Sequence, residues 1–218
     1  FNYSESLFGK ICSHDSLRRA FRVVKRNGGA PGVDGVTIGK FEQNLNEELG
    51  QLEEEIKGWT YKPRPVRRVE IPKPGQAGQR QLGIPCIRDR VVQTSIKEAI
   101  EPLFDSQFSE NSYGFRPGRN QQQAISAAQR IVQSGKEYVV DIDLEKFFDR
   151  IHHDRLIHRL GGKIEDKRIL RLIGLTLRSG VMKDGVVTSN HEGSVQGSPL
   201  SPLLSNVVLD ELDKELER

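Results

Sequence analysis

The chain has 218 residues, of which 35% are hydrophobic and 29% are charged. This length and composition allow a sizeable buried core and exclude a disordered tail. The net charge of +3 does not identify a polyanion-binding protein, but it does not exclude one, because 33 Lys and Arg residues gathered on one face would still meet phosphates.

Cysteine usage and hydropathy narrow the cellular context. Cys12 and Cys86 are far apart and lack the paired spacing of a zinc site, so we expect free thiols in a reducing compartment. No apolar run approaches the roughly 20 residues of a membrane span, and no signal peptide opens the chain. We therefore expect an intracellular protein without a membrane partner.

The N-terminal third predicts helices on both sides of a glycine-rich loop. Apolar residues at helical spacing predict two short helices within residues 1–27. Four glycines and a proline predict a loop over 28–37. An apolar stripe then predicts an amphipathic helix over 41–58, closed by Gly58, with acidic residues on its other face.

A basic hairpin and a helix are predicted next. Residues 61–85 are rich in Pro and basic side chains, and their alternating apolar residues indicate two short strands joined by a turn near Pro74 and Gly75. Residues 87–108 carry a helical stripe that Pro102 is expected to close.

A loop containing two arginines leads from this helix into another. The stretch SYGFRPGRN is punctuated by Gly and Pro, and Asn120 is a plausible cap for the helix that follows it. The helical spacing of Ala124, Ala128 and Ile131 predicts that these three side chains form its inner face.

The stretch VVDIDLEKFFDRIHHDRL, residues 139–156, predicts a strand, a turn and a helix. Its strand ends on Asp141 and Asp143. Because carboxylates are costly to bury without a partner, a strand that carries them at its end presents them to a cation, a basic partner or water. The stretch therefore predicts a functional site.

The C-terminal part predicts a helix over 166–178, a hairpin built on Asp184 and Gly185, and a last helix that starts at Ser201 and Pro202. This last helical pattern runs to the final residue without a terminating Gly or Pro, and the first residue is Phe1 rather than Met. We therefore expect the chain to be a piece of a longer protein.

Three motifs carry a resemblance to a known family. YGFRPGR, DIDLEKFFD and QGSPLSPLLSN, in this order and with these separations, resemble successive sequence blocks of reverse transcriptases of the group II intron (maturase) type. The upstream GAPGVDG loop and the IPK and LGIP segments of the hairpin fit the same family. The resemblance therefore covers nearly the whole chain.

The resemblance implies an α+β fold with the fingers and a partial palm of a right-hand polymerase, helix-rich with short antiparallel β-hairpins. Residues 1–118 would form an N-terminal extension and fingers, and 119–150 the palm with the first acidic block. Residues 151–195 would return to the fingers, and 196–218 would form a truncated part of the palm.

The implied activity is RNA-directed DNA polymerisation by two-metal nucleotidyl transfer, with Mg²⁺ or alternatively Mn²⁺ as cofactor. The implied partners are dNTPs, an RNA template, a DNA or RNA primer, and intron RNA that the protein binds for splicing. Carboxylates at a strand end suit this chemistry, because Mg²⁺ prefers one or two carboxylates together with substrate phosphates. A cytoplasmic protein of bacterial origin is expected.

The family pattern places the metal-binding Asp five residues before a bulky Phe or Tyr, which selects Asp143 with Phe148. In this register the backbone carbonyl of Leu144 also faces the metal. The resemblance further implies that Phe148 would lie below the sugar of the incoming nucleotide, where its bulk would exclude a 2′-hydroxyl. The alternative for Asp141 is a surface or salt-bridged carboxylate.

Further substrate contacts follow from the same resemblance. Lys73 and Arg80 match the family's triphosphate-binding residues, with a solvated basic turn as their alternative. Gln196 and the backbone of Gly197 match positions against the nucleotide and the template base, where glycine permits close approach.

Seven basic residues are candidates for nucleic-acid binding. They lie in the N-terminal segment, in the hairpin and in the arginine-containing loop: Arg22, Lys25, Arg26, Arg67, Arg68, Arg116 and Arg119. Guanidinium groups suit bidentate phosphate contacts. For the two loop arginines the alternative is a structural one, in which they tie the loop to a neighbouring strand.

The family's second acidic block, a Tyr-Ala-Asp-Asp hairpin, does not occur in the sequence. We therefore expect residues 1–218 to be catalytically incomplete, with exposed apolar surface that favours self-association. Two alternatives remain open for the function. One is an RNA-binding splicing cofactor, and the other is a reverse transcriptase of the type linked to CRISPR or to diversity generation.

Overall fold

The computed structural model of the chain describes residues 6–72, 75, 79–190 and 192–218. Four helices form the N-terminal part: α1 (Leu7–Cys12), α2 (His14–Asn27), α3 (Ile38–Gln43) and α4 (Leu45–Lys57). The two predicted short helices and the glycine loop after them are confirmed. The single helix predicted over 41–58 is wrong, because the chain leaves helical geometry at Asn44, whose φ and ψ are −114° and 28°.

The predicted basic hairpin is confirmed. Strands β1 (Val66–Pro72) and β2 (Gln79–Ile84) pair antiparallel, with Arg67 opposite Ile84. Pro74, at the predicted turn, lies outside the described residues.

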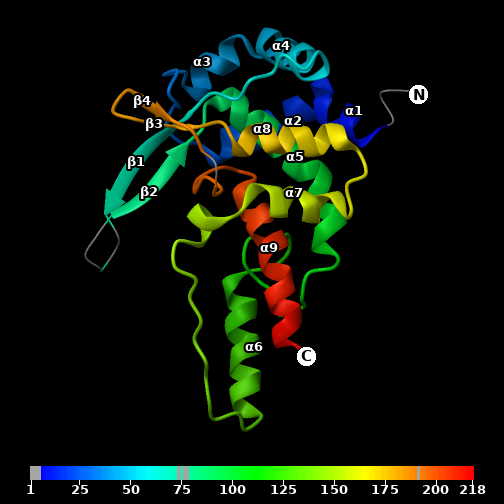
Figure 1. The fold of residues 1–218 in the computed structure, drawn as a ribbon, viewed down its shortest axis with the longest axis vertical. Helices are drawn as coiled ribbons and strands as arrows, with labels where there is room; N and C mark the ends of the chain where they lie inside the picture. The colour runs from blue at the N-terminus through cyan, green and yellow to red at the C-terminus, as the bar shows by residue number, and fades with distance from the viewer. Residues whose placement is uncertain (1–5, 73–74, 76–78, 191) are drawn as a thin grey trace.

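Helix α5 (Ile87–Asp105) follows the hairpin and runs through the centre of the molecule (Figure 1). Pro102 lies inside α5 rather than at its end, so the predicted stop is wrong. A proline at this position removes one backbone hydrogen bond of the helix. Continuing the helix buries the side chain of Phe104, and this burial offsets the loss.

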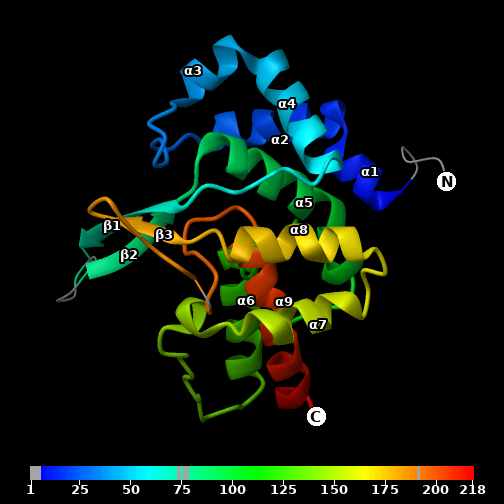
Figure 2. The same cartoon turned by 45° about the horizontal axis from the view of Figure 1, so that its top comes forward.

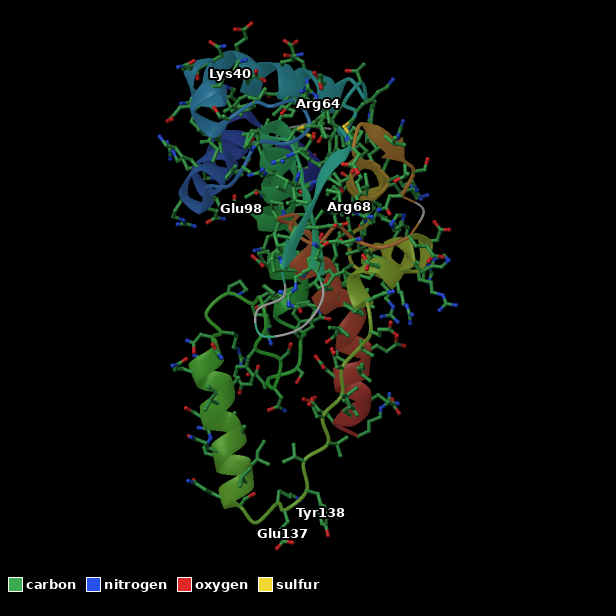
Figure 3. The ribbon with its side chains drawn as sticks, turned by 90° about the vertical axis from the view of Figure 1, so that its left-hand side faces the viewer. Lys40, Arg64, Arg68, Glu98, Glu137 and Tyr138 are labelled. Atoms are coloured by element: carbon green, nitrogen blue, oxygen red, sulfur yellow. The ribbon has the colours of Figure 1, made fainter. Side chains whose placement is uncertain are left out.

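Helix α6 (Gln121–Gln133) begins with a capping box, in which Asn120 and Gln123 each bind the other's backbone N–H. Its predicted inner face is wrong, because α6 has no buried residue and 52% of Ile131 is exposed. Figures 1 and 3 show α6 standing apart from the rest of the molecule, with Glu137 and Tyr138 near its far end.

The strand predicted over residues 139–143 is also wrong. This segment forms no sheet, and the side chains of Val139 and Val140 are each 82% exposed. A strand needs a neighbouring strand to take its backbone hydrogen bonds, and in the described part of the chain no strand lies beside this segment. The β-branched residues correctly predicted an extended backbone, but they do not determine whether a neighbouring strand is present to pair with it.

After this segment the chain folds back onto the body. A 3₁₀ turn (Phe147–Arg150) leads into α7 (His153–Gly161) and α8 (Lys167–Leu177). The hairpin predicted on Asp184 and Gly185 is confirmed, since both residues have positive φ, and it joins β3 (Val181–Lys183) to β4 (Val186–Thr188).

The last helix, α9 (Ser201–Leu216), begins at Ser201 as predicted, with Leu200 rather than Ser201 in the capping position.

The strands form one sheet in the order β2-β1-β3-β4, and β1 pairs with β3 in parallel. The sheet is therefore mixed, whereas purely antiparallel pairing was expected. It lies at one side of a helical body in which α5 is covered by α1, α2, α8 and α9 (Figure 2). The helix-rich α+β class is confirmed.

Both cysteines are free thiols, as predicted, and both are buried. Within the described ranges, no helix is both long enough and apolar enough to cross a membrane.

Candidate active site

One open groove collects most of the residues that the sequence assigned to the metal and the nucleotide. Its lining includes Arg80 from β2, Asp143 and Leu144 from the extended segment, Phe148 from the 3₁₀ turn and Gln196 from the loop before α9. These segments are far apart in the sequence, and the fold brings them to one place. The side of α9 that carries Leu209, Leu212, Asp213 and Leu216 closes the groove.

Backbone hydrogen bonds hold Phe148 and its turn in place. Its carbonyl accepts a hydrogen bond of 2.7 Å from the N–H of Ser194, and the N–H of Gly193 donates to the carbonyl of Ile151 at 2.8 Å. The rings of Phe147 and Phe148 meet edge to face, with centroids 5.8 Å apart. The turn that presents Phe148 is thus pinned to the loop before α9.

Gln196 and Gly197 lie directly on the backbone of β2. The N–H of Gly83 donates to the carbonyl of Gln196 at 2.8 Å. Gly197 has φ +112°, and a Cβ there would lie 2.6 Å from the carbonyl oxygen of Gly83. A Cβ on Gly83 would lie 2.1 Å from a methyl group of Val195. Gly197 therefore requires glycine because it touches the backbone of β2, and Gly83 because branched side chains fill the space beside it.

Phe148 and Gln196 also line a second groove, on the side of the glycine loop. Its other walls include Gly28 to Ala30, Phe115, Gly197 to Pro199 and Pro202. Gly197 lines this second groove and not the first, whereas Phe148 and Gln196 line both.

The oxygen donors of the first groove suit a hard divalent ion, because Asp143 supplies a carboxylate and Leu144 a carbonyl. Asp149 and Asp213 line the same groove, but Asp141 does not. Across residues 6–72, 75, 79–190 and 192–218, no three His, Cys, Asp or Glu side chains converge as a metal-binding group. The described donor set therefore fits one ligand position of a metal site and falls short of a two-metal centre.

The arginines of the hairpin have different environments. Arg80 is exposed at the groove, and Arg68 is half-buried beside Gln81 and Asp149 in an adjoining cleft. Figure 3 shows Arg68 on the hairpin. Arg67 donates twice to the carbonyl of Pro31, at 3.1 and 2.9 Å, and so ties β1 to the glycine loop. Lys73 lies outside the described residues.

The guanidinium of Arg116 is occupied by the protein itself. Its Nε donates to the carboxylate of Asp105 at 2.8 Å, and its two terminal nitrogens donate to the carbonyls of Asp105, Ser109 and Ser112. It is 9% exposed. The structure therefore favours the structural alternative for this arginine.

Arg119 and the basic residues of α2 lie nearer the solvent. Arg119 pairs with Glu110 and stacks over Tyr113, with 5.4 Å between the guanidinium carbon and the ring centroid. Arg22 and Arg26 are exposed on α2. Lys25, between them, forms an ion pair with Glu42 at 2.5 Å.

Sequence reasoning missed Arg90, which organises the glycine loop from inside. Its Nε donates to the carbonyl of Pro85 at 2.9 Å, and its terminal nitrogens donate to the carbonyls of Gly28 and Ala30. Burial lowers the pKa of this guanidinium. The sequence signal is weak: Arg90 follows Ile87 by three residues and so falls on the apolar face of α5.

The groove therefore combines a carboxylate, an aromatic ring and an arginine on a helix-rich α+β body, and these are side chains that a nucleotide-binding site uses. Residues 71–218 match the family model described as "Reverse transcriptase (RNA-dependent DNA polymerase)". The chain therefore belongs to the reverse transcriptase family. Members of this family use divalent metal ions.

Relatives among curated proteins cover almost all of the chain. Protein YkfC of Escherichia coli (strain K12) is 37% identical over 97% of this chain and 57% of its own length. The group II intron-encoded protein LtrA of Lactococcus lactis subsp. cremoris is 34% identical over 95% of this chain and 34% of its own. The chain thus spans about half and a third of the length of these relatives.

A solved structure shares the fold. The "Partial Cas6-RT-Cas1--Cas2 complex" contains a chain that superposes with a TM-score of 0.64 at 24% identity, covering 98% of this chain and 35% of the other. The predicted resemblance to reverse transcriptases, with group II intron-encoded proteins among the relatives, is confirmed.

Proposed function

We propose that the protein to which these residues belong is an RNA-directed DNA polymerase of the group II intron type. It copies an RNA template into DNA by extending a DNA or RNA primer with dNTPs. Residues 1–118 serve as N-terminal extension and fingers, 119–150 and 196–218 as palm, and 151–195 as the return to the fingers. The intron type is proposed from the sequence relatives, since the likeness to the CRISPR-associated structure concerns the fold alone.

The observation that supports this proposal most is the convergence of Arg80, Asp143, Phe148 and Gln196 on one groove. Each has a distinct task in nucleotidyl transfer. Arg80 is exposed beside the groove and can bind the triphosphate of the incoming nucleotide. Phe148 faces the same space and limits the room below the sugar, which favours a nucleotide without a 2′-hydroxyl.

The carboxylate of Asp143 and the carbonyl of Leu144 would hold Mg²⁺, for which Mn²⁺ can substitute. When bound, the metal supplies charge stabilisation to the attacking and leaving oxygens. One carboxylate is a small share of the ligands that two ions need. We therefore propose that residues 1–218 alone do not extend a primer.

Primer extension on an RNA template with Mg²⁺ and dNTPs tests this proposal. The protein expressed from its complete reading frame is compared with its Asp143→Asn variant and with Asp141→Asn as a matched control. We expect extension by the parent and by Asp141→Asn, and none by Asp143→Asn. Unchanged extension by Asp143→Asn would refute the site assignment, and extension by residues 1–218 alone would show that their own carboxylates suffice.

A second candidate function, intron RNA binding for splicing, is favoured by the exposed Arg22 and Arg26 on α2. Each phosphate contact contributes roughly 0.7 to 0.9 to the slope of log affinity against log salt concentration. The double variant Arg22→Gln, Arg26→Gln removes up to two such contacts and should lower the magnitude of that slope for residues 1–218 by up to about 1.4 to 1.8. Arg155→Gln, an exposed arginine on α7, is the control. No measurable affinity for intron RNA at low salt would exclude this function.

A further inference from the structure

His153 is a buried polar residue that the groove itself does not use. It lies in the first turn of α7 and is 3% exposed. Its Nε2 lies 2.7 Å from the carbonyl oxygen of Gly193. Because a carbonyl can only accept, Nε2 carries the proton and donates. The other ring nitrogen, Nδ1, is buried and has no hydrogen-bond partner within the described part of the chain.

An unsatisfied buried nitrogen costs free energy, so a histidine at this position needs a compensating role. An apolar side chain of similar volume would fill the space without that cost. What it could not provide is the hydrogen bond to Gly193. The role of His153 therefore depends on the segment that this hydrogen bond holds in place.

The bond leads directly to the turn that carries Phe148. Gly193 and Ser194, next to the bonded carbonyl, donate their N–H groups to the carbonyls of Ile151 and Phe148 at 2.8 and 2.7 Å. The ring of His153, the Gly193–Ser194 segment and the Phe148–Ile151 turn thus form one closed set of hydrogen bonds. Asn190 adds a weaker bond of 3.3 Å to the same carbonyl of Gly193.

The two backbones also touch with no spare room. Gly193 has φ +86°, and a Cβ there would lie 2.9 Å from the carbonyl oxygen of Asp149 and 3.0 Å from that of Phe148. Any displacement of Gly193 towards the turn must therefore move the backbone of Phe148. The loop and the turn behave as one unit, and His153 fixes that unit to α7.

We propose that His153 is a positioning residue that sets how far Phe148 projects into the groove, and thereby sets the discrimination between dNTPs and rNTPs. This inference rests on the proposed function, in which Phe148 faces the sugar. A bulky ring excludes a single hydroxyl group only if its position is fixed to a fraction of an ångström. Losing the bond from His153 leaves Gly193 held on that side by the weaker bond from Asn190.

Two substitutions at His153 separate the hydrogen bond from the packing. In His153→Gln the side-chain amide nitrogen reaches about as far as Nε2 and can donate to the carbonyl of Gly193. In His153→Leu the volume is largely kept and no donor remains. Gly193→Ala pushes the same turn from the other side, and Gly50→Ala, on α4 in open space, is its control.

The readout is the ratio of kcat/KM for a dNTP to that for the matching rNTP, measured with the protein expressed from its complete reading frame. Phe148→Ala is the reference, and thermal unfolding of every variant is recorded. Since a misplacement of about 1 Å can change a rate by about 100-fold, we expect His153→Leu and Gly193→Ala to lower the ratio roughly 10-fold or more. His153→Gln and Gly50→Ala should keep the parental ratio.

The outcomes distinguish this inference from the function on which it rests. If Phe148→Ala lowers the ratio while His153→Leu and Gly193→Ala leave it unchanged, His153 stabilises the fold only and the inference is overturned. If Phe148→Ala itself leaves the ratio unchanged, Phe148 does not face the sugar of the nucleotide. The inference about His153 is then overturned as well. A variant that melts lower but keeps the parental ratio counts against positioning.

Discussion

Mild acidification is predicted to stabilise the chain through Asp89, in the first turn of α5. This residue is 1% exposed, and its carboxylate accepts hydrogen bonds from the hydroxyl of Tyr61 at 2.7 Å and from the N–H of Arg64 at 3.1 Å. Burial nevertheless raises the pKa of the carboxyl from 3.8 to about 6, because the lost hydration outweighs both bonds and the nearby Arg88.

The direction of the pH dependence follows from the order of the folded and unfolded pKa values of Asp89. The folded state takes up the proton at a higher pH than the unfolded chain, so this contribution is fully present below pH 3.8 and is lost as the pH rises through about 6. A shift of about two units corresponds to roughly 3 kcal/mol. About 2 kcal/mol of this is gained between pH 7.5 and pH 4.5.

Urea unfolding of the parent and of Asp89→Asn, at several pH values between 4.5 and 7.5, measures this contribution. Asn is neutral throughout, and the difference between the two proteins cancels the titration of the other carboxylates. We expect the free energy of unfolding of the parent to rise by about 2 kcal/mol relative to the variant as the pH falls. Parallel profiles would show that Asp89 titrates normally and refute the reasoning.

Two further predictions concern the groove and its surroundings. Gly197→Ala should lower the free energy of unfolding by roughly 1–3 kcal/mol and weaken dNTP binding. Residue 197 has φ +112°, and the new Cβ would lie 2.6 Å from the carbonyl oxygen of Gly83. A thermal unfolding curve that matches the parent would contradict this. Arg116→Lys should lower the melting temperature by several degrees while the folded protein keeps its RNA affinity, since a lysine cannot replace the four hydrogen bonds to residues 105–112. Reduced RNA affinity with an unchanged melting temperature would instead show that Arg116 binds nucleic acid.

Local chemistry made much of the fold predictable. Asn120 with Gln123 encodes a capping box, and Asp184 with Gly185 encodes a turn with two positive φ values, so both elements were found from neighbouring residues alone. The errors arise where packing against distant segments, or the lack of it, decides the structure. Pro102 stays in α5, and Ile131 stays in solvent, for reasons that no short window of sequence contains.

The site was predictable to the extent that a motif encodes it. Asp143, Phe148 and Gln196 were assigned from family blocks, and the fold brings them to one groove. The supporting residues carry no such signal. In the sequence His153 is one member of a His-His-Asp run, and Arg90 reads as one charge within a helix. Their roles depend on carbonyls 40 and 60 or more residues away, which only the folded chain reveals.

The two sides of the groove differ in how firmly they are held. On one side, backbone hydrogen bonds fix Phe148, and the contact between Gly83 and Gly197 leaves no room for a single methyl group. On the other side, Asp143 belongs to an extended segment in which Tyr138 is 92% exposed. The side of the groove that presents Phe148 is therefore fixed by hydrogen bonds and close backbone contact, whereas the segment that carries Asp143 is exposed along its length.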